Sequence, residues 1–470
     1  MCAKRHVAAL PDGIGPCAFY RVWLPLMTRQ ARDPSFCASL LQQYPADAAD
    51  WEVLELQRWF QADRRTIFDR LKRQLPPGGR LIFDLDDLLL PGMVPKFNCY
   101  SHLFNDVAGK ALAYYLAGAD TVTLSTQQLK RELVRRKLVS AHQAVVIPNR
   151  LPRWWAEQDD PERRRRRFRM RRERPRIVFP SGISHYDFRD IGEPDDFSVI
   201  ADWVIANRRR LEFVFFGALP PRLAAYRRDF TVVPLAPSPD FLRRLRELEP
   251  QLLIQPLRDL PFNRCKSDIK LLEAFALGIP ILTQNLPVYS RNPASCRFDD
   301  ASTLETALRA LLEDEERYLA VAERNAEVFA ETALERHPEE WDRVWNAPEA
   351  RPASERRAAR MQTMFRELLQ RAYEPVLIAD ADDAAKSFAA SAVAAGRTVA
   401  HVSMEGVKVR LRLCRWDQEE SLLLPGAATL EQIPEFRTLG EIAVDPRFDA
   451  AAAESLRRLA QREKIPCRDL

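Results

Sequence analysis

Short apolar segments alternate with longer amphipathic ones along most of this chain, and this alternation is the feature that most constrains its fold. Strand-like runs such as "RLIFDL" (residues 80–85) and "TVTLS" (residues 121–125) are separated by segments with apolar residues at helical spacing. After an arginine-rich stretch the alternation restarts and continues to about residue 335. Strands separated by helices form parallel sheets that helices cover. We therefore predict an α/β protein with two doubly wound, Rossmann-like domains, residues 1–155 and 156–345, which face a cleft.

The last part of the chain differs in composition from the rest. Residues 346–369 are highly charged and contain Pro348 and Pro352, which is typical of a linker that runs into a helix. Residues 370–470 again alternate between strand-like and helical segments, so we predict a small accessory α/β domain. This domain carries no chemical motif, and we expect a docking or oligomerisation module.

Composition excludes several classes of protein. No apolar run approaches the roughly 20 residues that a membrane-spanning helix needs, and the N-terminus lacks the apolar segment of a secretory signal. The eight cysteines form no C-x-x-C pair, and the six histidines show no metal-binding spacing. We therefore expect a cytoplasmic protein with no metal site and no cofactor.

The segment "PFNRCKSDIKLLEAFALGIPILTQNLPVY", residues 261–289, indicates a binding site. Lys266, Lys270 and Glu273 recur at i, i+4 and i+7, which predicts one face of a helix that Gly278 ends. Ammonium groups and free N–H groups at a helix start bind a diphosphate, and a carboxylate accepts two hydrogen bonds from a ribose diol. The alternative is an ordinary surface pair on an amphipathic helix.

The residues of this segment resemble the donor-binding helix of GT-B glycosyltransferases, of the group 1/family 4-like type that builds bacterial surface polysaccharides. "LLEAFALGIPILT" fits the Glu-Ala then Gly-x-Pro pattern, and "FNRCKSDIK" fits the K-S-x-x-K stretch before it. Further resemblances follow in the family's order over residues 5–335: "CAFYRVWLPL", "FDLDD", "ADTVTLST", "VVIPN" and "FPSGISHYDFRD".

The resemblance implies a set of residues for a nucleotide-diphospho-sugar donor. Lys266 and Lys270 would bind the diphosphate, Glu273 would bind the ribose, and Asn263 belongs to the same segment. Ser181 and Gly182 can present N–H groups to the donor phosphate, and His185 can contact the sugar, although a solvent-exposed His is as plausible. On the acceptor side we single out Gly13, Gly15 and Arg21, with a tight turn as the alternative for the two glycines.

One position departs from the family's pattern. Many members carry a second Glu eight residues before the ribose-binding one, and here Cys265 stands there. The resemblance therefore gives no acidic partner near the sugar and leaves open whether the product retains or inverts the anomeric configuration. A catalytically inactive glycan-binding or assembly module is the rival interpretation.

The acidic cluster in "FDLDDLLL" has two interpretations. An aspartyl-phosphate phosphatase would use Asp84 as nucleophile and Asp86 as general acid, but such a motif normally lies on the first strand of its domain. In a parallel sheet, carboxylates at the end of a strand lie at the mouth of the cleft. We therefore name Asp86 and Asp87 as candidate catalytic bases for an acceptor hydroxyl, with turn capping as the alternative, and expect Asp84 to be structural.

The basic stretch at residues 162–176 holds ten Arg and two Glu, although the net charge of the whole chain is only +5. A solvated interdomain linker is the first interpretation. Peripheral contact of residues 163–176 with an anionic membrane, at its inner face, is the second and would suit a lipid-linked glycan acceptor. Nucleic acid is the least favoured partner, because only Phe168 could stack on a base. The sequence thus predicts a metal-independent sugar transferase that acts on a glycan or lipid-linked glycan.

Overall fold

The computed structural model divides the chain into two compact units, residues 1–362 and 363–470. In the first unit it describes residues 6–12, 15–33, 36–41, 48–155, 159–170, 173–188, 190–233, 236 and 238–345. In the second it describes residues 376–379, 399–405, 408–415, 418–424, 441–444, 450–463 and 467–469. We call residues 6–155 the first half and residues 159–345 the second half of the first unit. The predicted linker at 346–369, and Gly13 in the first half, lie outside the described residues.

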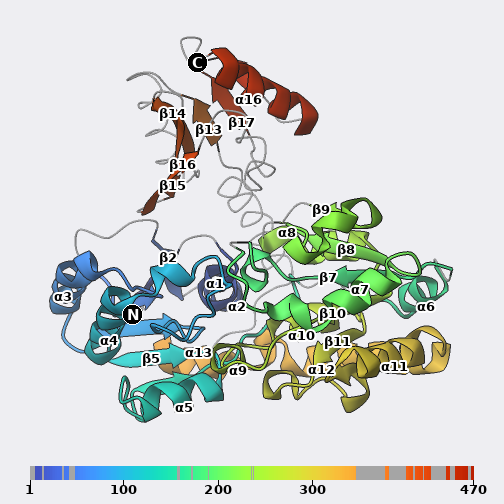
Figure 1. The fold of residues 1–470 in the computed structure, drawn as a ribbon. Coiled ribbons are helices and arrows are strands. Elements are labelled where there is room, and N and C mark those ends of the chain that lie inside the picture. The colour runs from blue at the N-terminus through green and yellow to red at the C-terminus, as the bar shows by residue number, and fades with distance from the viewer. Residues whose placement is uncertain are drawn as a thin grey trace. The chain divides into compact units, whose positions relative to one another are not determined.

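The first half contains a six-stranded sheet with the order β2-β1-β3-β4-β5-β6, in which every neighbouring pair is parallel (Figure 1). Strand β4 lies inside this sheet between β3 and β5, so its side chains are covered on both faces, which is why its sequence is a nearly continuous apolar run. The strands are β1 (His6–Leu10), β2 (Cys37–Leu40), β3 (Val53–Gln57), β4 (Arg80–Leu85), β5 (Thr121–Leu124) and β6 (Ala144–Val146).

Helices with one apolar face cover this sheet. Asn105 and Thr126 begin two of them, because each side chain accepts a hydrogen bond from a free backbone N–H of the first turn. The helices are α1 (Pro16–Ala18), α2 (Leu24–Arg32), α3 (Arg65–Gln74), α4 (Asp106–Gly118) and α5 (Gln127–Arg135), with a π-helical turn, Phe19–Trp23, between α1 and α2.

The second half repeats this architecture with the order β12-β11-β10-β7-β8-β9, again with all neighbouring pairs parallel. The strands are β7 (Arg176–Phe179), β8 (Glu212–Phe216), β9 (Thr231–Val233), β10 (Leu252–Gln255), β11 (Ile281–Gln284) and β12 (Arg297–Phe298). The helices are α6 (Pro161–Arg169), α7 (Ala201–Asn207), α8 (Ser238–Glu247), α9 (Pro261–Arg264), α10 (Ile269–Ala276), α11 (Ala301–Leu312), α12 (Glu315–Thr332) and α13 (Pro338–Trp345).

Helix α13 joins the end of the second half to the sheet of the first. The indole N–H of Trp345 donates to Glu55 on β3 at 2.9 Å, inside the buried core. Asp342 on the same helix accepts from Arg29 on α2 at 2.6 Å. The two halves are therefore tied by a helix as well as by the contacts of the site described below.

The second unit has a mixed sheet with the order β16-β15-β14-β13-β17-β18, in which β14, β15 and β16 pair antiparallel and the other pairs are parallel. Its elements are β13 (Val376–Ala379), β14 (Val399–Glu405), β15 (Lys408–Arg415), β16 (Gln418–Leu424), β17 (Glu441–Val444), α16 (Ala450–Glu463) and β18 (Cys467–Asp469). The presence of both strands and a helix agrees with the accessory α/β domain that we predicted.

Two local predictions differ from the structure. The basic stretch is not a linker over residues 161–169, because these residues form α6. Helix α10 begins at Ile269 and not at Lys266, so Lys266 lies in the loop before the helix. Among the described residues, no helix is long and apolar enough to cross a membrane.

Candidate active site

One short segment of the first half, α1 with the following π-helical turn, contributes to three groups of contacts in the candidate site. It begins at Gly15, the residue before the first turn, and Pro16 at the start has the backbone angle that a helix requires. Cys17, Tyr20 and Arg21 then point to three different sets of partners, described in turn below. A π-helical turn inserts an extra residue into a helix and is frequent at functional sites.

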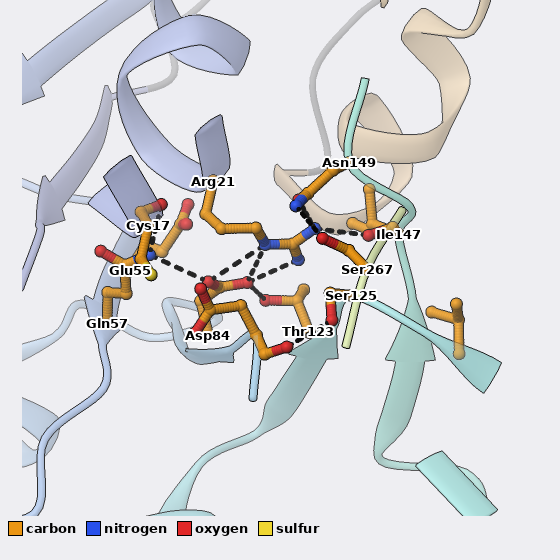
Figure 2. A network of polar contacts seen from close by, with 12 residues as sticks. Cys17, Arg21, Glu55, Gln57, Asp84, Thr123, Ser125, Ile147, Asn149 and Ser267 are labelled. Atoms are coloured by element: carbon orange, nitrogen blue, oxygen red, sulfur yellow. Dashed lines mark hydrogen bonds and ion pairs between the residues drawn. The ribbon is translucent and has the colours of Figure 1, made fainter. Parts of the chain in front are cut away.

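Arg21 lies at the centre of a buried polar network (Figure 2). Its guanidinium donates to Asp84 at 2.7 Å, to the carbonyl of Ile147 at 2.5 Å and to Asn149 at 3.1 Å. Asp84 also accepts from the hydroxyl of Thr123 at 2.7 Å. Arg21 is 1% exposed and Asp84 is fully buried, so each charge is neutralised within the core.

This network bears on the interpretations of Asp84 and of Arg21. Asp84 is structural, as we expected, because its oxygens are occupied by buried donors from two strands, β3 and β5, and from the π-helical turn. A phosphatase nucleophile must be open to its substrate, so the buried Asp84 argues against that alternative. Arg21 has a structural role in the described residues, and its proposed contact with an acceptor stays a prediction that its burial does not favour.

Asp86 and Asp87 follow directly after β4 and lie beside Cys17. One carboxylate oxygen of Asp86 lies 3.5 Å from Nε of Arg58, which in turn lies 3.4 Å from Asp12. Burial, together with the negative charges of Asp86 and Asp87, raises the pKa of the Cys17 thiol well above its usual value, and Arg58 opposes this shift. The thiol is therefore protonated at neutral pH and can donate a hydrogen bond to Asp86.

Cys17, Asp86 and Asp87 are also the group of described residues with ligand atoms close enough to share a cation, since these atoms lie within 4.8 Å of one another. The guanidinium of Arg58 supplies a positive charge beside Asp86. The expectation that the protein needs no metal remains a prediction.

Glu273, the predicted ribose ligand, is held from both halves of the unit. The hydroxyl of Tyr20, in the π-helical turn, donates to its Oε1 at 2.5 Å. The ammonium of Lys270, one turn earlier on α10, donates to its Oε2 at 2.8 Å and lies 4.5 Å from the centroid of the Phe241 ring. Glu273 is 1% exposed, so the apolar helix α10 brings a carboxylate into the core where only these charged and hydroxyl groups compensate it.

Lys266 connects the donor segment to the acidic cluster of the first half. Its ammonium lies 3.7 Å from Asp87 and 4.7 Å from the centroid of the Phe262 ring. A further link comes from Ser267, whose hydroxyl accepts from Asn149 at 2.8 Å. The structure thus brings together the candidates Lys266, Lys270, Glu273, Asp86 and Asp87 where the two halves meet.

Cys265 lies against the first half and is fully buried. Its carbonyl accepts from the hydroxyl of Thr126 at 2.8 Å, and its side chain packs in the apolar cluster beneath the first sheet together with Phe262. Burial raises the pKa of its thiol to about 12. The position where the family has a second Glu is therefore a neutral, apolar contact between the halves.

Two of the remaining donor candidates, His185 and Asn263, contact Asp196, which begins a short 3-10 helix after β7. His185 lies 2.8 Å from Oδ2 of Asp196, and the amide of Asn263 donates to Oδ1 at 2.8 Å. Ser181 is buried and donates to Gln255 at 2.6 Å. A side chain at Gly182 would meet open space, so the backbone there is accessible.

These partners are structural in the described residues, because they connect the segment after β7 with α9 and with the end of β10. The predicted donor contacts of Ser181, Gly182, His185 and Asn263 stay predictions. The sequence analysis missed Tyr20 as a site residue, although it stands next to Arg21 in the motif "CAFYRVWLPL". It also missed Asn149, which ends the motif "VVIPN".

Comparison with known proteins supports the fold. No protein-family model and no curated protein sequence matches this chain. Its structure is similar to that of sucrose-phosphate synthase from Thermosynechococcus elongatus, with a TM-score of 0.52 at 13% identity, over 73% of this chain and 98% of that one. It is also similar to HepE from Anabaena in complex with UDP-glucose, with a TM-score of 0.50 at 10% identity, over 73% of this chain and 100% of that one. With its two parallel six-stranded sheets, the first unit of this chain therefore has the GT-B fold.

Proposed function

We propose that this protein is a glycosyltransferase, which transfers a sugar from a nucleotide-diphospho-sugar to a glycan or lipid-linked glycan in bacterial surface polysaccharide synthesis. The observation that carries the proposal is the meeting of Lys266, Lys270 and Glu273 with Asp86 and Asp87 at the junction of two parallel sheets. Ligands of α/β proteins bind at the carboxyl ends of such strands, and β4 ends at this junction.

In this proposal the donor binds to the second half. Glu273 accepts hydrogen bonds from the ribose hydroxyls, and Lys266 and Lys270 bind the diphosphate. When the bond between the sugar C1 and the diphosphate oxygen breaks, its electron pair stays on that oxygen, and the two ammonium groups stabilise the charge that develops there. HepE was solved with UDP-glucose, so uridine nucleotides are the first donors to test.

The acceptor hydroxyl approaches from the first half. Its oxygen forms the new bond to C1, and its proton passes to a carboxylate, Asp86 or Asp87. Asp87 is the better placed of the two, because it already lies beside Lys266 and is less buried than Asp86. A side chain at Gly15 would meet no atom within 4 Å, so the backbone there is a further candidate for contact with the acceptor.

We also propose a peripheral contact of residues 163–176 with an anionic membrane. Ion pairs within the protein reduce the positive charge that this segment can offer to lipid headgroups. Arg163 and Arg166 both pair with Glu249, at 3.1 and 2.7 Å, and Arg169 pairs with Glu315 at 2.9 Å. Cosedimentation with phosphatidylserine-containing vesicles tests it. Binding that is no stronger than to neutral vesicles would remove this partner.

The direct test of the function is the change Glu273→Ala. Calorimetric titration with UDP, GDP and ADP should show that at least one binds the wild-type protein and that the variant binds it tenfold or more weakly, since a hydrogen bond to a charged group contributes about 1.5–3 kcal/mol. Glu313→Ala, on the exposed face at the end of α11, is the matched control and should bind normally. Equal affinity in the Glu273 variant would contradict the proposal.

The rival function, an inactive glycan-binding module, is favoured by one observation. Cys265 replaces an acid and is sealed in an apolar contact. Incubation with a panel of nucleotide sugars separates the two functions. A transferase slowly transfers the sugar to water, and thus releases nucleoside diphosphate, even when no acceptor is present. No release from any donor, together with saturable glycan binding, would establish the rival.

A further inference from the structure

The carboxylate that would bind the donor ribose already has a hydroxyl group on it. Tyr20 and Glu273 are 253 residues apart and come from different halves, yet the phenol O–H donates to Oε1 at 2.5 Å. This is the same interaction, hydroxyl to carboxylate oxygen, that a ribose hydroxyl would make.

Both oxygens of Glu273 have donors, and the side chain is almost completely covered. Oε2 accepts from Lys270, and the residue is 1% exposed. Because Glu273 is so fully covered, a ribose cannot reach its carboxylate in this arrangement unless one of the groups that cover it moves. In the proposed function the ammonium of Lys270 also binds the diphosphate and stays in place. Tyr20 is therefore the group that we expect to move away from Glu273.

Displacement of Tyr20 requires a rotation of its side chain, because its backbone is held in place. The next residue, Arg21, is anchored by Asp84, Ile147 and Asn149. Tyr20 is 6% exposed, and its ring makes edge contacts with Phe19 at 5.4 Å and with Trp155 at 6.2 Å between ring centroids. The donor must therefore displace a buried side chain of the π-helical turn to reach Glu273.

We propose that Tyr20 is a stand-in for a ribose hydroxyl, which the donor displaces from Glu273 when it binds. This inference rests on the proposed function. Tyr20 then competes with the donor for Glu273. Its displacement would link donor binding to the segment that also places Cys17 beside Asp86 and Asp87.

The test is a cycle of two proteins and two nucleotides. The wild-type protein and Tyr20→Phe are titrated with UDP and with 2′,3′-dideoxyuridine diphosphate, which has no hydroxyl to compete for Glu273. If UDP does not bind, the diphosphate that binds in the panel above and its dideoxy form replace it. We expect Tyr20→Phe to bind UDP about tenfold more tightly, because one hydrogen bond to a charged acceptor no longer has to be broken. The dideoxy nucleotide should bind both proteins equally.

The control variant makes the same Tyr-to-Phe change at a position outside the site. Tyr114 also donates to a carboxylate, Asp69, at 2.7 Å, but on the outer surface of α4. Tyr114→Phe should leave both affinities unchanged. Tyr20→Phe retains the ring and its contacts with Phe19 and Trp155, and thermal unfolding checks that the variant folds.

The possible failures can be told apart. Weaker or unchanged binding of the ribonucleotide by Tyr20→Phe, or an equal gain for the dideoxy nucleotide, would overturn the displacement by the donor and leave the transferase proposal intact. If no nucleoside diphosphate binds either the wild-type protein or Tyr20→Phe, the proposed function fails and the inference fails with it.

Discussion

The ammonium of Lys266 lies 3.7 Å from the carboxylate of Asp87, and this pair joins a loop of the second half to the end of β4 in the first. In the proposed reaction one of these residues stabilises the leaving diphosphate and the other accepts the proton of the incoming hydroxyl. Bond breaking and bond formation at C1 then occur in one place, within reach of both groups. The apolar contact of Phe262 with the first half supports the same loop.

The first prediction concerns the charge of this loop. Lys266→Ala should weaken the binding of a nucleoside diphosphate about tenfold, because a hydrogen bond to a charged phosphate is lost. The affinity for the corresponding nucleoside should not change, since it has no phosphate. Parallel calorimetric titrations check this, and an equal loss for nucleoside and diphosphate would show that the lysine acts only on the structure.

The second prediction concerns the buried pair of Arg21 and Asp84. Asp84→Ala should lower the free energy of unfolding by about 3–5 kcal/mol, because the guanidinium of Arg21 stays buried without its partner. Glu313→Ala removes an ion pair on the exposed face of α11, to Arg309, and should cost less than about 0.5 kcal/mol. Urea unfolding measures both changes. Similar losses for the two variants would contradict the structural role of Asp84.

The third prediction concerns pH. Burial, with a further contribution from Asp84, raises the pKa of Glu55 from 4.5 to about 8, against the opposing effects of Trp345 and Arg21. The folded state thus holds a proton that the unfolded state releases, so the contribution of Glu55 to stability is fully present below pH 4.5 and is lost as the pH rises to about 8.

The variant Glu55→Gln isolates this effect. Glutamine does not titrate and keeps an oxygen that can accept from Trp345. Relative to the wild-type protein, the variant should therefore gain stability from pH 5 to pH 8 in urea unfolding. A difference that does not depend on pH would show that Glu55 is ionised in the folded protein.

The fourth prediction separates two arginines of the same helix. Arg167 on α6 is buried and donates to the carbonyls of Leu277 and Gly278, at 3.1 and 2.9 Å, just beyond the end of α10. Arg167→Ala should destabilise the protein by about 2–3 kcal/mol, because these carbonyls lose their donors. Arg165→Ala, at an exposed position of α6, should change stability by less than about 0.5 kcal/mol. Chemical unfolding of the two variants under one set of conditions provides the comparison.

Much of the fold could be predicted from local pattern. Strand β4 was predicted at Arg80–Leu85 and observed there, because a continuous apolar run between a Pro-Gly turn and acidic residues has few alternatives. Gly278 was predicted to end α10, and it adopts a left-handed φ of +55° directly after the helix, where a side chain would overlap Asp159. In contrast, the edge strand β2, "CASL", was missed, because four residues without a polar and apolar alternation carry almost no signal.

For the candidate site, the sequence alone determined which residue types stand on α10 and in the loop before it, since their spacing and the motif around them are local properties of the chain. Only the tertiary structure decided what these residues touch. In the structure Arg21 is buried against Asp84, and the hydroxyl of Tyr20 donates to Glu273. Part of the arginine-rich stretch forms a helix whose Arg167 donates to the carbonyls just beyond the end of α10. The reason is physical: whether a charge faces water or a buried partner depends on residues that are hundreds of positions away, and no local pattern of polarity contains that information.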